Sequence, residues 1–173
     1  MEELTLILEK ATKAIEGKYF LLSLDGGDPV YRERLYCYEL YHQMRCLWPN
    51  TGFYLNGEVD KAAHPILQQW GADRKKPDFL VHTPDSMAGN NTIIEVKHIK
   101  SSGDKILKDL ETLTLFVTKV RYKRAILLFF GYDTVDNIVA KVRNQIKNVP
   151  HEVAPFELWF HHNVGKEAVQ LEI

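Results

Sequence analysis

Two stretches decide the fold of this chain: Lys76-Pro77-Asp78-Phe79-Leu80-Val81 and Thr92-Ile93-Ile94-Glu95-Val96-Lys97. Both are typical of β-strands that carry charged residues among apolar ones. Side chains in a strand point to alternate faces, so Glu95 and Lys97 share one face of the second strand. The segment between the strands, 84–91, consists mostly of turn-forming residues. We therefore expect an antiparallel hairpin in which the charged side chains of the two strands meet.

The carboxylates of this hairpin, Asp78 and Glu95, predict a cation between them. Two neighbouring carboxylates repel and raise each other's pKa, so such a pair persists only with a cation to compensate it. Ligation by oxygen atoms alone suits Mg²⁺ or Mn²⁺. Lys97 lies beside the pair and completes a site for phosphoryl transfer. Its ammonium can orient an attacking water or neutralise the charge that develops on a phosphate.

Pro77-Asp78 followed by Glu95-Val96-Lys97 resembles the PD-(D/E)xK motif of the restriction-endonuclease-like nuclease superfamily. In that superfamily the Asp and the Glu bind a divalent metal and the Lys assists the water nucleophile. The resemblance implies these roles for Asp78, Glu95 and Lys97, and it adds the backbone carbonyl of Val96 as a metal ligand. The motif is short, and its weight comes from the apolar strands around it. It implies an α/β, restriction-endonuclease-like fold, with a central mixed β-sheet flanked by helices and the core order αβββαβ.

The order of elements along the chain agrees with one domain. A chain of 173 residues with 45% apolar content can bury a core, and it contains no internal repeat or linker. We expect a single restriction-endonuclease-like nuclease domain over 1–173, with an N-terminal helical segment 1–28. Apolar periodicity predicts further helices over 30–47, 104–120 and 136–148. Besides the hairpin, strands are expected over 53–60, 125–130, 156–160 and 168–173.

The helix expected over 30–47 carries two acids that can reach the metal. Members of the resembled superfamily place a glutamate of this helix near the metal. We favour Glu39 as this accessory catalytic residue and keep Glu33 as its competitor. Glu58, at the end of the first expected strand, is a further candidate metal ligand. Each of these acids can instead be a surface or salt-bridged residue.

Contacts with nucleic acid must come from local charge, because the net charge of the chain is −1. A basic run, Arg74-Lys75-Lys76, precedes the first strand of the hairpin, and a second one, 121–124, precedes the next strand. Lysines and arginines in such runs can neutralise phosphates beside an acidic pocket. The residues that we assign to nucleic-acid binding are Arg74, Lys75, Lys76, Lys100 and Gln43.

The function expected from these residues is that of a nuclease dependent on Mg²⁺ or Mn²⁺, which hydrolyses phosphodiester bonds in nucleic acid, in DNA rather than RNA. Endonuclease and exonuclease activity both stay open. The alternative is a weak or inactive module of the same fold that binds nucleic acid or protein. The resemblance also implies a homodimer. The start of the sequence lacks a basic leader with a cleavage site, and no apolar run is long enough for a bilayer, so a cytoplasmic protein without a membrane partner is expected.

Overall fold

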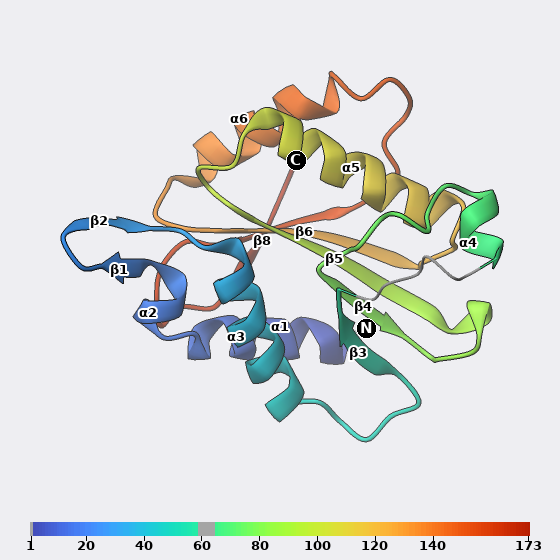
Figure 1. The fold of residues 1–173 in the computed structure, drawn as a ribbon, viewed down its shortest axis with the longest axis horizontal. Coiled ribbons are helices and arrows are strands. Elements are labelled where there is room, and N and C mark those ends of the chain that lie inside the picture. Colours follow the sequence, from blue (N-terminus) through green and yellow to red (C-terminus); the bar gives the residue numbers. More distant parts are fainter. Residues whose placement is uncertain (1, 59–64) are drawn as a thin grey trace.

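The computed structural model of the chain describes residues 2–58 and 65–173. Its centre is a six-stranded mixed sheet with helices on both faces (Figure 1). The strands follow in the spatial order β3 (Tyr54–Gly57), β4 (Phe79–His82), β5 (Asn90–His98), β6 (Arg124–Phe130), β7 (Glu157–His161) and β8 (Val169–Leu171). β5, β6 and β7 are parallel, whereas the other neighbouring pairs are antiparallel. The expectation of an α/β fold with a mixed sheet flanked by helices is confirmed.

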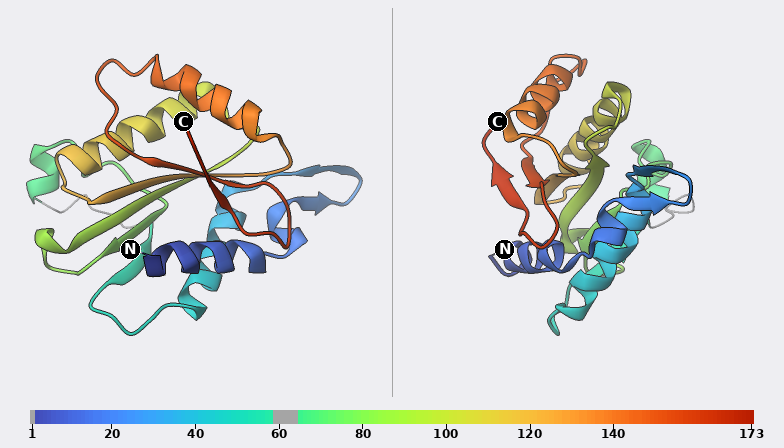
Figure 2. Two further views of the ribbon diagram at one scale, coloured as in Figure 1. Left: turned by 180° about the vertical axis from the view of Figure 1, so that it is seen from behind. Right: turned by 90° about the vertical axis from the view of Figure 1, so that its left-hand side faces the viewer.

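The helices form a layer on each face of the sheet (Figure 2). One layer contains α1 (Glu2–Ala14) and α3 (Glu33–Cys46), and the other contains α5 (Gly103–Thr118) and α6 (Val135–Ile146). The short helical pieces are α2 (Gly17–Phe20), α4 (Pro65–Gln69) and the 3₁₀ turn η1 (Met87–Gly89). The central elements follow the order α3-β3-β4-β5-α5-β6, interrupted by α4 and η1. Within 2–58 and 65–173, each helix is too short or too polar to cross a bilayer.

The strand β6 shows why this sequence forms a layered structure. Every residue of β6 is buried, as a continuous apolar run predicts for a strand that is covered on both faces. Side chains that alternate along the strand enter opposite cores. One set packs with α1 and α3: Ile126, Leu128 and Phe130. The other set packs with α5 and α6: Ala125, Leu127 and Phe129.

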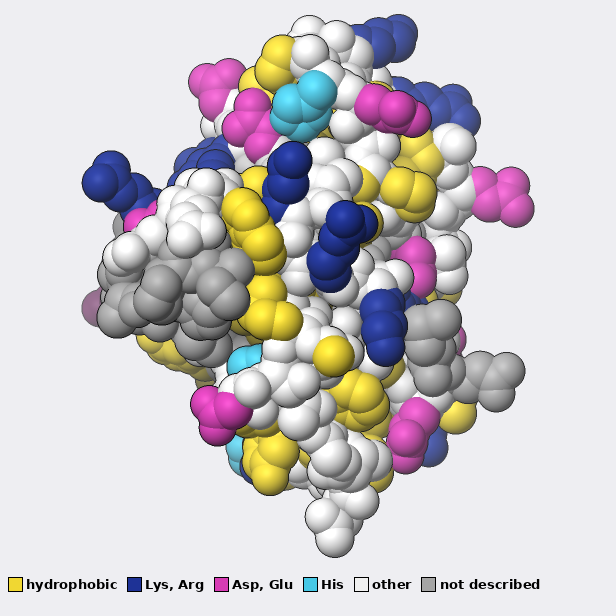
Figure 3. All heavy atoms as spheres, turned by 90° about the vertical axis from the view of Figure 1, so that its right-hand side faces the viewer, with side chains coloured by type: hydrophobic (Ala, Val, Ile, Leu, Met, Phe, Trp, Pro, Cys, Tyr) yellow, Lys and Arg dark blue, Asp and Glu magenta, His cyan; other side chains and the backbone are white. Residues whose placement is uncertain are grey.

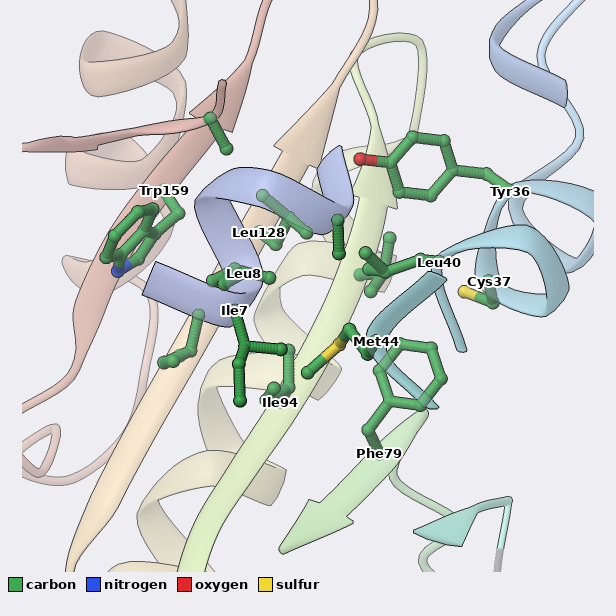
Figure 4. Close-up of a cluster of buried hydrophobic side chains, with 14 of the residues drawn as sticks. Ile7, Leu8, Tyr36, Cys37, Leu40, Met44, Phe79, Ile94, Leu128 and Trp159 are labelled. Atoms are coloured by element: carbon green, nitrogen blue, oxygen red, sulfur yellow. The ribbon is translucent and has the colours of Figure 1, made fainter. Parts of the chain in front are cut away.

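The neighbouring strand β5 follows the same alternation. Ile94 and Val96 belong to the core beneath α1 and α3, where Ile94 lies among the side chains shown in Figure 4. Glu95 and Lys97 therefore project toward the opposite layer, which contains α5. In β4, Leu80 packs in that same layer. The two strands of the hairpin thus present their charged side chains on one face of the sheet.

The N-terminal part of the chain differs from the expected helical segment 1–28. After α2, the strands β1 (Leu22–Leu24) and β2 (Gly27–Val30) form an antiparallel hairpin. Gly26 has a φ of +70° in its turn, a conformation that glycine adopts without strain. Pro29 lies in β2, where a two-stranded sheet leaves an open edge for a residue without an N–H. α3 consequently begins at Glu33 instead of Val30.

The first strand of the sheet is shorter than the strand expected over 53–60. β3 ends at Gly57, and Glu58 follows it with a φ of +41°. Residues 59 and 60, the end of the expected strand, lie outside the described residues. The other expected helices and strands are present, with bounds that differ from the expected ones by a few residues.

Candidate active site

The hairpin of β4 and β5 brings Asp78 against Glu95. The antiparallel register pairs Phe79 with Ile94, so its continuation by one residue places Asp78 opposite Glu95. The backbone N–H of Val96 donates a hydrogen bond of 2.7 Å to Oδ2 of Asp78, which fixes the orientation of this carboxylate. The two carboxyl groups also share a hydrogen bond. We call Asp78 and Glu95 the acid pair.

Burial makes the acid pair difficult to ionise fully. It raises the pKa of Glu95 well above its ordinary value, and the charges of Asp78 and Asp109 raise it further. Burial also raises the pKa of Asp78, to about 6, although the charge of Lys97 acts in the opposite direction. Glu95 as a whole residue is only 5% exposed. Without a cation, burial therefore opposes full ionisation of the acid pair.

Lys97 is held beside the acid pair by three acceptors. Its Nζ lies 3.0 Å from Oε1 of Glu33, 3.1 Å from Oδ2 of Asp109 and 2.8 Å from the carbonyl oxygen of Val96. The contacts with Glu33 and with the Val96 carbonyl are hydrogen bonds, and the contact with Asp109 is an ion pair. Burial by itself would lower the pKa of Lys97, but the charges of Asp109, Asp78 and Glu33 raise it above its ordinary value. The lysine is therefore a fixed positive charge.

Of the two acids considered on α3, Glu33 and not Glu39 reaches the site. Glu33 contacts Lys97, whereas Glu39 accepts a hydrogen bond of 2.7 Å from Nε2 of Gln43, one turn along the helix. The structure therefore brings Glu33 to Lys97 and leaves Glu39, the favoured accessory residue, outside the pocket. Gln43, expected to contact nucleic acid, is turned toward Glu39 instead. Because α3 starts at Glu33, only its first turn borders the site, and the rest of the helix packs on the sheet.

Asp109 is the acid of this site that the sequence argument missed. It lies on α5, is 6% exposed and pairs with Lys97. Burial raises the pKa of Asp109 to about 7, while the charge of Lys97 opposes this increase. A signal was present in the sequence, because Asp109 falls between the apolar positions Ile106 and Leu110 of an amphipathic helix. A carboxylate among core positions requires a partner, and here the partner is Lys97.

These side chains line a pocket of about 350 Å³, the site pocket. Its inner part holds the acid pair, Lys97, Glu33 and Asp109. Its outer part is basic and is formed by Arg34, Arg74, Lys75, Lys76 and Lys108. Glu58 lines the pocket as well, where its carboxylate pairs with Nε of Arg34 at 3.3 Å. The expected run Arg74-Lys75-Lys76 therefore borders the candidate catalytic residues.

The other basic residues considered for nucleic-acid binding lie away from the site pocket. Lys100 has its Nζ 5.7 Å from the ring centre of Tyr31 and does not line the pocket. The run 121–124 lies at the end of the sheet where β6 begins. The side of the molecule at the right of Figure 1 carries several lysine and arginine side chains near its middle (Figure 3). Arg124 itself is buried and makes two hydrogen bonds of 2.6 Å to Glu157.

The donor atoms of the acid pair fit a magnesium or manganese ion. In the part of the chain that the structure describes, no group of three or more His, Cys, Asp or Glu side chains is arranged to hold a metal. Mg²⁺ does not require such a group, because it is commonly bound by roughly one or two carboxylates, with water and substrate phosphates as its other ligands. The Val96 carbonyl, which the motif implies as a further metal ligand, accepts a hydrogen bond from Lys97 in this structure. Asp78 and Glu95 thus supply the number and kind of ligand that this metal takes.

Comparison with known proteins assigns no family to the chain: no family model, no curated protein and no solved structure matches it. The function is therefore inferred from the chemistry of the site pocket and from the resemblance in the two strands of the hairpin.

Proposed function

We propose that the protein is a metal-dependent nuclease of restriction-endonuclease-like fold that hydrolyses phosphodiester bonds, in DNA rather than RNA. One observation carries the proposal: two apposed carboxyls with raised pKa values lie beside a buried, charged lysine. Structural ion pairs alone do not explain why Asp78 and Glu95 are placed against each other. The order α3-β3-β4-β5-α5-β6 supports the fold that the motif implies.

In this proposal Asp78 and Glu95 hold Mg²⁺ or Mn²⁺. The ion would supply charge to stabilise the phosphate oxygens and would lower the pKa of a water molecule. Lys97 keeps its positive charge in the buried pocket, so it can orient the nucleophilic water or stabilise the developing charge on the phosphate. Glu33 and Asp109 are positioning residues, because they fix the ammonium of Lys97.

The basic residues of the site pocket serve to bind the strand on both sides of the reacting phosphate. Arg74, Lys75 and Lys108 are charged side chains around an acidic interior. Without them, the carboxylates of the interior would repel a polyanion. Release of counterions from the nucleic acid by such cations would supply most of the affinity.

A second candidate function is binding of nucleic acid or protein without cleavage. The observation that favours it is that Lys97 is already held by two hydrogen bonds, to Glu33 and the Val96 carbonyl, and by an ion pair with Asp109. To assist a water or a phosphate, the ammonium must give up one of these partners. If it does not, the pocket is a charged binding site with no catalytic lysine.

Cleavage of a panel of substrates tests the proposal. Single-stranded, double-stranded and branched DNA and single-stranded RNA are incubated with the protein in Mg²⁺, Mn²⁺ or EDTA. We expect cleavage of at least one DNA substrate in the metals and none in EDTA, with Asp78→Asn, Glu95→Gln and Lys97→Met inactive. Glu39→Gln is the matched control, since Glu39 is an acid of α3 outside the pocket. Cleavage that persists in Asp78→Asn, or no cleavage of any substrate, would overturn the proposal.

A further inference from the structure

A second cavity, of about 450 Å³, adjoins the site pocket. Tyr38 and Tyr41 of α3 and Phe79 of β4 line it, and Asn56 lies at its wall. We call it the aromatic cavity. Glu58 and Asp78 line both cavities. Asp78, one of the residues proposed to hold the metal, therefore borders both cavities.

The two cavities differ in chemistry. The site pocket is lined mainly by charged groups. The aromatic cavity shares two acids with it, Glu58 and Asp78, but its other lining residues are uncharged, and three of these are aromatic. Charged groups suit a phosphate, and aromatic faces suit a nucleobase. A nucleotide that places its phosphate at Asp78 thus finds an aromatic wall next to that phosphate.

The rings of the aromatic cavity have different surroundings. Tyr41 is fixed, because its ring stacks on Phe79 with centroids 6.3 Å apart and planes at 12°, and its hydroxyl donates to the carbonyl of Leu55 at 3.3 Å. Tyr38 is 61% exposed, and within 2–58 and 65–173 its side chain makes no ring contact or hydrogen bond. Tyr38 therefore offers an aromatic face that a base can cover.

A paired base cannot use this cavity. In a duplex the bases are stacked and paired in the interior, so a protein pocket next to the backbone phosphate receives a base only after it has left the stack. The volume of the aromatic cavity lies within the range of about 300–1,000 Å³ that is usual for small-ligand sites, which is sufficient for one base. The arrangement favours a nucleotide that is already unpaired.

We propose that the aromatic cavity binds the base of an unpaired nucleotide next to the phosphate at Asp78 and Glu95. This inference rests on the proposed nuclease function and specifies its substrate: single-stranded nucleic acid, or an unpaired end or branch of a duplex. Tyr38 stacks on the base. Asn56, whose Oδ1 lies 2.9 Å from Nε2 of His82, offers its amide NH₂ group to the base edge.

Binding measurements test this inference without relying on cleavage. Fluorescence anisotropy gives the affinity for a short single strand, for the blunt duplex and for the duplex with an unpaired overhang, in Ca²⁺, which takes the same kind of oxygen ligand. We expect Tyr38→Ala to lose roughly tenfold in affinity for the single strand and the overhang, the size expected when one base loses its stacking partner. Affinity for the blunt duplex should not change.

Two variants control this experiment. Tyr38→Phe keeps the ring and should bind as the wild type does. Tyr132→Ala removes a tyrosine that is 50% exposed and lines neither cavity, so it should leave all affinities unchanged. A 2-aminopurine base next to the reacting phosphate should be quenched by the wild type and less so by Tyr38→Ala.

The outcomes separate this inference from the proposed function. Equal affinity of Tyr38→Ala and the wild type for the single strand overturns the aromatic cavity as a base site, even if the protein cleaves DNA. Tighter binding of the blunt duplex than of the single strand also overturns it. Binding that depends on Tyr38 in a protein without cleavage supports the base site and leaves the nuclease function wrong. The overhang and the single strand together distinguish duplex ends from free strands as the source of the nucleotide.

Discussion

At the scale of single residues, the carboxyls of the site pocket make the stability of the metal-free protein depend on pH. Burial raises the pKa of Asp78 to about 6 and that of Asp109 to about 7, from an ordinary value of 3.8. Between pH 3.8 and about pH 6 to 7, the folded protein therefore binds more protons than the unfolded chain. The contribution of these groups to the free energy of unfolding is therefore complete below pH 3.8 and is lost as the pH rises through about 6 to 7.

The variant Asp78→Asn tests this sign. An asparagine keeps an acceptor for the N–H of Val96 but never becomes charged. In EDTA at pH 8 we expect Asp78→Asn to melt about 2–4 °C above the wild type, the shift that ~1 kcal/mol gives in a protein of this size. The difference should shrink toward pH 4. His161, whose pKa burial lowers to about 4, acts with the opposite sign but is common to both proteins. A wild type that is more stable than the variant at pH 8 would contradict the raised pKa of Asp78.

The positioning of Lys97 gives a second prediction at this scale. Asp109→Asn and Glu33→Gln each remove one charged partner of the ammonium, so Lys97 should be less well placed for catalysis. We expect kcat to fall by roughly 10- to 100-fold with little change in KM, since small displacements of a catalytic group can cost about 10²-fold. The pKa of Lys97, followed by NMR of its labelled side chain, should fall in both variants.

Glu39→Gln is the matched control for this pair, because it makes the same change on α3 without touching the pocket. Its kinetics and the pKa of Lys97 should equal those of the wild type. If Glu39→Gln lowered kcat more than Glu33→Gln, Glu39 would be the accessory residue after all.

At the scale of elements, the sequence predicted those features that local pattern determines. The turn residues at 84–91 and the apolar strands beside them predicted the hairpin, and its register brings Asp78 to Glu95. The continuous apolar run of β6 predicted a central strand. The hairpin of β1 and β2 was missed, because its strands are short and their residues are exposed or half-buried.

The site residues that lie on helices were harder to predict from the sequence. Which acid of α3 meets Lys97 depends on where the helix begins and how it packs against β5, and neither follows from periodicity within the helix. Glu33 and Glu39 lie on the same expected helix, and the pattern of the helix did not decide between them. The burial of Asp109 is explained by its partner Lys97 on β5, which the pattern of the helix alone does not reveal.

The segment 74–76 gives a prediction at the scale of an element. Reversal of Arg74, Lys75 and Lys76 to glutamate should sharply weaken nucleic-acid binding, because these residues border the site pocket. The slope of log affinity against log salt should become shallower by roughly one unit per lost phosphate contact. Fluorescence anisotropy at several salt concentrations measures both quantities.

The matched control is a triple reversal at the other end of the sheet, Lys119, Arg121 and Lys123, which changes the net charge equally. It should alter affinity and salt slope much less, since these residues lie outside the site pocket. Equal effects of the two triple variants would mean that nucleic acid does not enter the pocket.

The homodimer implied by the motif stays a prediction, which sedimentation velocity checks.

At the scale of the whole molecule, metal binding should stabilise the fold. The acid pair costs stability when its charge is uncompensated, and a ligand that binds only the folded state raises its stability by ~2.7 kcal/mol at a hundred times its dissociation constant. Mg²⁺ or Mn²⁺ should therefore raise the melting temperature of the wild type. Glu95→Gln should remove most of this increase, whereas Glu172→Gln, a change of an exposed acid near the C-terminus, should retain it.

The position of a bound metal is the sharpest test of the proposed metal site. Crystals of the protein grown with Mn²⁺, and measured near the manganese absorption edge, give an anomalous difference map that locates the ion without reference to activity. We predict a manganese peak between the carboxylates of Asp78 and Glu95, with Lys97 still paired to Glu33 or Asp109. A map with no peak at the acid pair, at a manganese concentration that supports cleavage, would contradict the proposed metal site.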